Sequence, residues 1–306
     1  MPALEAMVAP ETGGDPASSL KFTRRSLRYL AHQLDFPISP TIVGRLLRVL
    51  DYSTRVNVKR FTGPPHPQRD TQFQYIQEVQ QQFLDAGLPV LSVDTKKKEL
   101  IGNFKNSGAC WCREGIEVNA HDFRQDAQCR AIPYGLYDVE HNHGHFCVGT
   151  STDTSQFAVD AIRHWWRSKG TSRYPDADEL LIEADAGGSN GYRRRLWKRE
   201  LQQWADQDAL TITVCHFPTG ASKWNPIEHR LFSHVSRNWA GIPLRSLDTM
   251  LHLLRGTTTT TGLRVTATRN TRTYSQVAVS DSEMRELCIE RHAICPDWNY
   301  TIHPRA

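Results

Sequence analysis

Long hydrophobic runs are missing from this sequence of 306 residues. A helix that spans a bilayer needs about 20 consecutive residues that are mostly apolar, and the sequence has no such stretch. Its N-terminus also lacks the basic region followed by an apolar stretch that marks a secretory signal. With 39% hydrophobic and 23% charged residues and a mean hydropathy of −0.52, the composition is that of a soluble globular protein. Membrane and secreted classes are therefore disfavoured.

A disulfide framework is missing as well. The seven cysteines are an odd number scattered over a long chain, which predicts free thiols in a reducing cytoplasm. Cys110, Cys112 and Cys129 lack the C-x-x-C spacing of a zinc ribbon. The histidines between His141 and His145 fall in an expected exposed hairpin turn, without a partner at zinc spacing. Metal binding at either group is the less favoured interpretation, and it stays open.

A strong net charge is absent too, because the sum is only +4. The charge is uneven, however. Residues 20–60 contain nine Lys or Arg and two acids, so this segment carries +7 and the remainder about −3 by difference. A basic N-terminal part is thus followed by a slightly acidic body.

Two short amphipathic helices are predicted in the basic part, over residues 20–61. Thr23 is the expected cap of the first helix, and Ser39 followed by Pro40 marks the start of the second. Apolar residues recur at helical spacing at Leu27, Leu30, Ala31 and Leu34, and again at Val43, Leu46, Leu47 and Leu50. The polar faces carry Arg24, Arg25, Arg28, Arg45 and Arg48. This pattern is typical of a helix-turn-helix that binds DNA, and a helical hairpin with solvated arginines is the alternative.

The rest of the chain predicts a mixed α/β architecture. A proline-rich linker and a helix occupy 62–87, after a flexible N-terminus at 1–19. Strands are expected at 89–94, 131–139, 144–150, 179–184 and 210–216, and helices at 154–168, 190–206 and 225–239. This order predicts a five-stranded mixed sheet with helices on both faces, over residues 88–240. Residues 241–306 are expected to form an extension packed on this core, with a strand at 263–268 and helices at 247–254 and 282–289.

Three carboxylates stand out because of where these elements place them. Asp94 ends the first strand, Asp185 ends the fourth, and Glu228 lies in the first turn of the helix after the fifth. If the first and fourth strands are neighbours, both aspartates lie at the sheet edge where active sites of open α/β sheets gather. The alternative is that they are ordinary acids at strand ends and at a helix start.

Three acids held together without a cation would raise one another's pKa values. A pair of Mg²⁺ ions about 3.5–4 Å apart would remove this repulsion and hold the attacking and leaving oxygens of a phosphoryl transfer. Hard oxygen ligands suit Mg²⁺ or Mn²⁺. Asp94, Asp185 and Glu228 are therefore candidate ligands of such ions.

Neighbouring residues support these positions. Asp185 begins a glycine-rich run in which Asn190 is expected to cap the next helix. Asn225 is expected to cap the helix that carries Glu228, with Pro226 at its first position.

Two basic runs flank the aspartates in the sequence. One consists of Lys96, Lys97 and Lys98, and the other spans 193–195. They are either solvated faces or contacts to DNA phosphates beside the acidic centre.

The segments 92–100, 185–191 and 225–228 together resemble the DDE transposases of bacterial insertion sequences, in particular the Rhodopirellula-type DDE transposase family. A looser likeness to the Tc/mariner superfamily accompanies it. The resemblance runs from about residue 20 to residue 304 and includes 131–135, 215–218 and 298–302. It implies a ribonuclease-H-like core whose catalytic, metal-binding triad is Asp94, Asp185 and Glu228. This triad would bind two Mg²⁺ ions, for which Mn²⁺ could substitute.

The resemblance also implies partners and a reaction. The partners would be the terminal inverted repeats of the element, target DNA and further copies of the chain, with no membrane. The reaction would be strand cleavage at the element ends and transfer of those ends into target DNA. A non-catalytic DNA-binding derivative and a general ribonuclease-H-like nuclease are the alternatives.

Two departures from the family pattern bear on activity. Ala186 stands where the family usually has a glycine, which would matter if the backbone there required a positive φ. The family also usually carries a longer N-terminal region, so a truncated copy is an expectation.

Overall fold

The computed structural model describes residues 13–14, 21–22, 26–54 and 66–305. The chain divides into two compact units, residues 1–62 and 63–306. Each unit is described by itself.

The first unit contains the two predicted helices, α2 (Leu27–His32) and α3 (Pro40–Val49), and a short antiparallel pair of β1 (Gly13–Gly14) with β2 (Lys21–Phe22). Ser26 caps α2, whereas Thr23, the expected cap, lies outside the described residues. Ser39 caps α3 as predicted, because its hydroxyl accepts a hydrogen bond from the Ile42 N–H at 3.3 Å.

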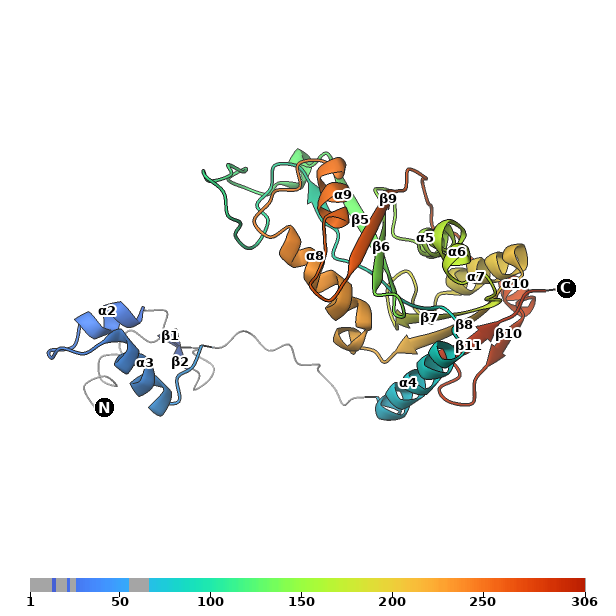
Figure 1. Ribbon diagram of the computed structural model, residues 1–306, viewed down its shortest axis with the longest axis horizontal. Coiled ribbons are helices and arrows are strands. Elements are labelled where there is room, and N and C mark those ends of the chain that lie inside the picture. The colour runs from blue at the N-terminus through green and yellow to red at the C-terminus, as the bar shows by residue number, and fades with distance from the viewer. Residues whose placement is uncertain (1–12, 15–20, 23–25, 55–65, 306) are drawn as a thin grey trace. The chain divides into compact units, whose positions relative to one another are not determined.

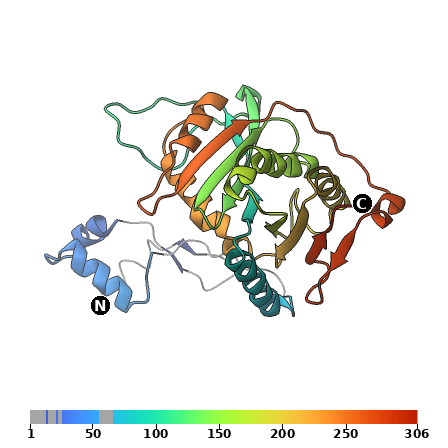
Figure 2. The same cartoon turned by 45° about the vertical axis from the view of Figure 1, so that its right-hand side comes forward.

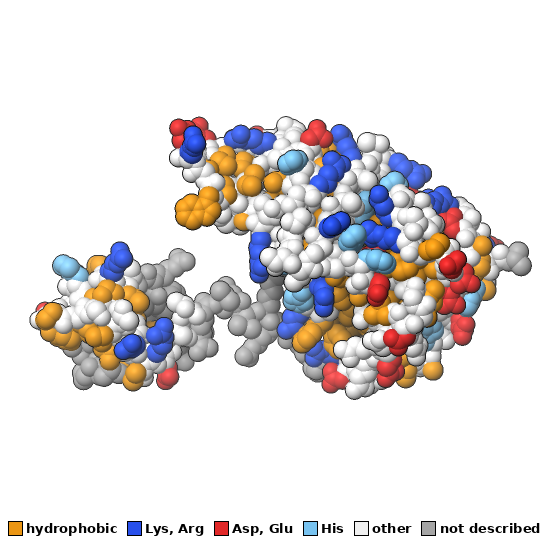
Figure 3. Space-filling model, viewed as in Figure 1, with side chains coloured by type: hydrophobic (Ala, Val, Ile, Leu, Met, Phe, Trp, Pro, Cys, Tyr) orange, Lys and Arg blue, Asp and Glu red, His pale blue; other side chains and the backbone are white. Residues whose placement is uncertain are grey.

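The core of this unit is small. Leu30, Val43 and Leu47 are buried against one another. Ala31, Leu34, Leu46 and Leu50 of the predicted pattern pack around them, whereas Leu27 is exposed. Other apolar side chains, such as Ile42 and Val49, stay exposed, and Figure 3 shows hydrophobic side chains on the surface of the unit. A core of this size stabilises a unit only weakly.

The second unit is built on a large mixed sheet, in which nine strands pair among the described residues (Figure 1). Its order is β10-β11-β8-β7-β3-β5-β6-β9, with β4 paired to β5. The bounds are β3 Val90–Thr95, β4 Glu99–Ile101, β5 Cys129–Asp138, β6 His143–Gly149, β7 Glu179–Asp185, β8 Thr211–Phe217, β9 Arg264–Arg269, β10 Ile289–Arg291 and β11 Asn299–Ile302.

The five predicted strands form the middle of this sheet, in the order β6-β5-β3-β7-β8. β3, β5 and β6 are antiparallel neighbours, while β7 and β8 join in parallel. The expected sheet is therefore too small. Residues after 240 add β9 in parallel beside β6, and β11 followed by β10 beside β8. The segment expected only to pack on the core is thus part of its sheet.

Helices cover both faces of the sheet (Figure 2). One face carries α5 (Ser155–Trp165) and α7 (Arg195–Asp208), whose apolar sides pack on it with three buried tryptophans, Trp165, Trp197 and Trp204. The other face carries α4 (Arg69–Asp85) over β3, β7 and β8, and α8 (Ser233–Asn238) with α9 (Leu247–Arg255) over β5, β6 and β9. This layered ribonuclease-H-like arrangement matches the predicted fold class.

Short helical segments complete the unit. They are η1 Arg124–Asp126, η2 Trp166–Gly170, α6 Thr171–Arg173, η3 Ser222–Trp224, η4 Glu228–Phe232 and α10 Asp281–Arg285. η2 and η4 are π-helical turns that continue from α5 and lead into α8.

Two local predictions are wrong. α7 begins at Arg195 rather than at Asn190, because the intervening residues form turns, with Gly188 at φ +78°. Asn190 therefore caps nothing. His145 is buried rather than exposed, since it lies within β6 and its ring nitrogens bond the hydroxyls of Thr266 and Thr268 on β9.

All seven cysteines are free thiols. In the described part of the chain, no helix has the length and apolar character needed to cross a membrane.

Glu183 is an unusual feature of the core, because it lies fully buried on β7 beneath α4. Gln80 of α4 donates to its Oε1 at 2.8 Å, while Oε2 has no hydrogen-bond partner among the described residues. Burial raises the pKa of Glu183 to about 8, although the hydrogen bond from Gln80 acts to lower this pKa. The carboxyl group is therefore protonated in the folded chain at neutral pH.

Replacing this group gives a test of the packing. The unfolded chain releases the Glu183 proton near its ordinary pKa of 4.5, whereas the folded chain holds it up to a pKa of about 8. Wild-type stability must fall as pH rises between these values. Glu183→Gln removes that loss, so its free energy of unfolding, measured in urea, should exceed that of the wild type increasingly across this range. Glu179→Gln, at the partly exposed start of β7, is the control and should give no such trend.

Candidate active site

Asp94 and Asp185 lie side by side at the ends of two neighbouring parallel strands. β3 and β7 pair in register, with Val93 opposite Ala184, so the next residue of each strand is an aspartate. Side chains alternate between the faces of a sheet. Val90 of β3 and Leu181 of β7 both face α4, and by this alternation both aspartates point to that face. The prediction that these two strands are neighbours in the sheet is confirmed.

Glu228 reaches the same face from the helical run that begins at Pro226. Ile227, Leu231 and Phe232 bury the apolar side of this run against β5 and β6. Gly135 of β5 pairs with Asp94, and a Cβ atom there would collide with the Phe232 ring. The glycine therefore allows the run with Glu228 to approach the sheet beside Asp94.

The pKa values reflect this proximity. Burial raises the pKa of Asp94 to about 8, with further increases from the charges of Asp185, Glu228 and Asp153 and a lowering by the Thr95 N–H. Burial also raises the pKa of Glu228, as does Asp185, while Lys96 lowers it. The three candidate carboxylates thus interact electrostatically as a group.

The donor set fits a hard divalent cation. Oxygen atoms of three carboxylates are the ligands that Mg²⁺ and Mn²⁺ prefer, and a cation would offset the repulsion that raises the pKa of Asp94. In the described part of the chain, no three His, Cys, Asp or Glu side chains are already arranged around a common ion position.

Asn225 ties these elements together. Its Nδ2 donates to Asp185 Oδ1 at 3.1 Å, and its Oδ1 accepts from the hydroxyl of Ser92 on β3. Ser92 Oγ also accepts from the Ile227 N–H at 3.1 Å. Asn225 directly precedes the helical run, with Pro226 at its first position as predicted, but its side chain makes these contacts instead of capping the run. Its buried amide bridges β3, β7 and the start of the run that carries Glu228.

A second buried chain of hydrogen bonds reaches the backbone carbonyl group of Asp185. His216 of β8 has Nδ1 3.1 Å from the Asp185 carbonyl oxygen and Nε2 3.2 Å from the Tyr300 hydroxyl. Trp197 Nε1 donates to that hydroxyl at 3.0 Å. Burial lowers the pKa of His216 to about 4, so the ring is neutral. A neutral ring with its proton on Nδ1 satisfies every one of these contacts.

The predicted lysine run divides into three environments. Lys96 is buried, lies 4.8 Å from the Trp239 ring centroid and has a lowered pKa, chiefly because of burial. Lys97 is exposed, and Lys98 pairs with Asp153 at 2.9 Å. Lys96 is therefore not a surface contact for DNA. It stands beside Glu228. Burial lowers the pKa of Lys96, and the charge of Glu228 partly offsets this by raising it.

The remaining predicted site residues fall in several places. Arg28, Arg45 and Arg48 are exposed on the first unit, whereas Arg24 and Arg25 lie outside the described residues. Ala186 does not have a positive φ, so the missing glycine causes no strain there. The positive φ of this turn belongs to Gly188.

Sequence reasoning missed Ser92, Gly135 and His216 as parts of the site. Ser92 and Asp94 share one strand face two residues apart, which the alternation of a strand could have indicated. His216 lay inside a segment that carried the family resemblance. Its role depends on contacts with residues far away in the sequence.

The structure thus brings Asp94 and Asp185 together at the ends of β3 and β7, with Glu228 approaching the same face of the sheet. Residues 3–304 match the family described as "Rhodopirellula transposase DDE domain". The chain belongs to this family, and it is a DDE transposase. No curated protein sequence matches it.

Solved transposase structures show a distant likeness. "Mos1 transposase paired-end complex with left transposon end" is 12% identical with a TM-score of 0.44, over 80% of this chain and 67% of that one. "Crystal structure of a pre-cleavage Mos1 transpososome" is 12% identical with a TM-score of 0.43 over the same shares. "Crystal structure of the Mos1 Strand Transfer Complex" is 13% identical with a TM-score of 0.42, over 80% and 66%.

The bridging amide of Asn225 can be tested by removing it. Asn225→Ala leaves the buried Ser92 hydroxyl without its acceptor and Asp185 without a donor, so the free energy of unfolding should fall by about 1–3 kcal/mol. Chemical denaturation at neutral pH measures this. Asn238→Ala is the control, because Asn238 is exposed and its amide bonds only the Leu253 carbonyl. An equal loss in both variants would contradict a special role for Asn225.

Proposed function

We propose that this chain is the transposase of a bacterial insertion sequence, acting in the cytoplasm. It cleaves DNA strands at the ends of the element and transfers those ends into target DNA. The observation that carries this proposal is the in-register pairing of β3 with β7, which sets Asp94 beside Asp185 on the face that Glu228 approaches. Asp94, Asp185 and Glu228 are the catalytic residues.

The same three carboxylates would hold two Mg²⁺ ions, with Mn²⁺ as a substitute. Such ions supply charge neutralisation, activation of water or a DNA 3′-hydroxyl, and stabilisation of the departing 3′-oxygen. The raised pKa of Asp94 supports this assignment, because a carboxyl group that holds its proton without a cation is ready to exchange it for one.

The surrounding residues orient this centre. Asn225 occupies one oxygen of Asp185 and leaves the other for a ligand. His216 holds the Asp185 carbonyl, so the backbone under the carboxylate is fixed. Lys96 beside Glu228 limits the negative charge on that side. Fixed groups of this kind need little reorganisation during the reaction.

DNA is both the molecule that is cleaved and the target into which the cleaved ends are transferred. The terminal inverted repeats would be recognised by the first unit, whose residues 20–60 carry +7 and whose Arg28, Arg45 and Arg48 are exposed. Lys97 and Lys98 would contact phosphates close to the carboxylates. Joining two ends requires two active centres in one complex, so we infer that the chain acts as a homo-oligomer.

Removing one carboxylate tests the catalytic assignment. Asp185→Asn should lower both cleavage and end joining by about two to three orders of magnitude or more, because charge stabilisation in the transition state is lost. DNA binding and thermal stability should stay close to the wild type. The assay follows nicking of a plasmid that carries the terminal repeats, with Mg²⁺ present.

Asp178→Asn is the matched control, because Asp178 is exposed and precedes the opposite end of β7. It should react like the wild type. End joining by Asp185→Asn at the wild-type rate would refute the assignment. Intact plasmid with the wild type would favour a DNA-binding derivative, and cleavage without preference for the repeats would favour a general nuclease.

The first unit is tested separately. Arg45→Ala combined with Arg48→Ala should weaken binding to a duplex of the terminal repeat about tenfold or more, because two exposed cations on α3 are lost. Fluorescence anisotropy measures the affinity, and Thr41→Ala on the same helix is the uncharged control. Unchanged affinity in the double variant would show that α3 does not contact the repeat.

A further inference from the structure

A groove of about 440 Å³ lies at the N-terminal ends of α5 and α7. We call it the basic groove, and its lining includes Lys98, Asp153, Ser189, Arg193, Arg194 and Arg195. Asp153 connects it to the active site, because Thr95 donates to its carboxylate at 3.4 Å and its charge raises the pKa of Asp94. A ligand in the basic groove would therefore lie beside Asp153, which contacts Thr95, the residue that follows Asp94.

Two helices begin at this groove. α5 starts at Ser155 after its cap Thr154, and α7 starts at Arg195 after Arg194. All four of these residues line the groove. Helix N-termini present free N–H groups and partial positive charge, which attract anions. In the described structure, neither the first turn of α5 nor the first turn of α7 contains an acidic residue.

The arginines make this end of α7 electrostatically unfavourable as it stands. Three consecutive cations occupy the positive end of the helix, where acidic residues are favoured. Arg195 pairs with Asp281 at 2.5 Å. Arg193 lies over the Tyr192 ring and Arg194 donates to the Gly188 carbonyl, and neither has a carboxylate partner in the described chain. A bound anion would relieve this repulsion.

Ser189 gives a second, independent indication of a ligand. Its side chain is 6% exposed, and its hydroxyl has no hydrogen-bond partner among residues 13–14, 21–22, 26–54 and 66–305. Buried hydroxyl groups are normally satisfied. A phosphate oxygen in the groove would accept a hydrogen bond from it.

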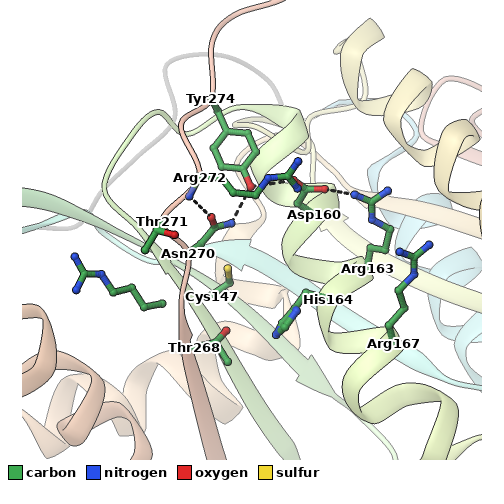
Figure 4. A pocket seen from close by; sticks show the side chains of 11 residues that line it. Cys147, Asp160, Arg163, His164, Arg167, Thr268, Asn270, Thr271, Arg272 and Tyr274 are labelled. Carbon is green, nitrogen blue, oxygen red and sulfur yellow. Dashed lines mark hydrogen bonds and ion pairs between the residues drawn. The ribbon is translucent and has the colours of Figure 1, made fainter.

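Another arginine-lined pocket contains three arginines that have carboxylate partners (Figure 4). This pocket of about 360 Å³ lies between α5 and the end of β9. Arg163 and Arg272 converge on Asp160 at 2.5 and 2.7 Å, and Arg167 pairs with Asp208 at 2.5 Å. Their charges are satisfied within the protein, unlike those of Arg193 and Arg194.

We propose that the basic groove binds phosphodiester groups of the DNA strand next to the cleavage site, through Arg193, Arg194 and the N-termini of α5 and α7. This assignment rests on the proposed transposase function, and it names where the substrate backbone lies beside the carboxylates. Phosphodiester and free phosphate share this chemistry, so the test separates them.

The test measures how DNA affinity depends on salt. The full chain is titrated against a fluorescent duplex of arbitrary sequence, without divalent ions, at several salt concentrations. Each phosphate contact contributes about 0.9 to the slope of log K against log salt. Arg193→Ala combined with Arg194→Ala should therefore lower the slope by about 2, whereas the lysine double variant, Arg193→Lys with Arg194→Lys, should keep it.

Arg272→Ala is the matched control, because its guanidinium group is paired with Asp160. It should leave the slope unchanged. An unchanged slope in the alanine double variant would overturn the proposal, and so would an equal decrease in the control. A loss in the lysine variant as large as in the alanine variant would indicate damage to the turn rather than lost charge, and would also count against it.

Inorganic phosphate distinguishes the two ligand sources. If phosphate raises the melting temperature of the wild type but not of the alanine double variant, while both bind the duplex with the same slope, the groove is a site for a free anion and the DNA assignment is wrong. No divalent ion is present, so these outcomes do not depend on cleavage. Failure of the Asp185→Asn test would refute the catalytic triad without changing the slope.

Discussion

The burial of Asp94 and Asp185 side by side is the constraint on which the rest of the active centre depends. Parallel pairing of β3 with β7 fixes the two aspartates as neighbours, and burial raises the pKa of both. Among the residues that the structure describes, neither aspartate has a cationic side chain as a direct partner. The protein holds them with neutral groups, the amide of Asn225 and the ring of His216, and places Lys96 beside Glu228 instead. Such a centre leaves carboxylate oxygens for a ligand that is not part of the chain.

The positively charged side chains around this centre differ in whether they have a carboxylate partner. Near the acids, Lys98 is matched to Asp153, and farther away Arg163 and Arg272 are matched to Asp160. Arg193 and Arg194, which line the basic groove, have no carboxylate partner in the described chain. An acidic centre that must accept a polyanion needs such unmatched cations nearby, since the DNA backbone and the carboxylates repel each other.

Features that depend on local pattern could be predicted from the sequence. The strands that end in Asp94 and Asp185, the Ser39 cap and the apolar spacing of Leu30, Val43 and Leu47 are examples. β10 and β11 were not predicted, because three or four residues show no readable alternation. The start of α7 was misplaced, since its apolar spacing fits either beginning. Ser92, Gly135 and His216 owe their roles to partners up to 135 positions away, which no local pattern reveals.

The hydrogen bond of Tyr300 with His216 makes the active centre dependent on the last strand of the sheet. Asp94 and Tyr300 are separated by most of the second unit, so the centre cannot be completed by local folding. A copy of the gene interrupted before the codon for Asn299 would still encode all three carboxylates. Its product would lack the strand that holds His216, and with it the fixed backbone under Asp185. The presence of the three acids in a damaged copy is therefore a poor guide to whether that copy can still move.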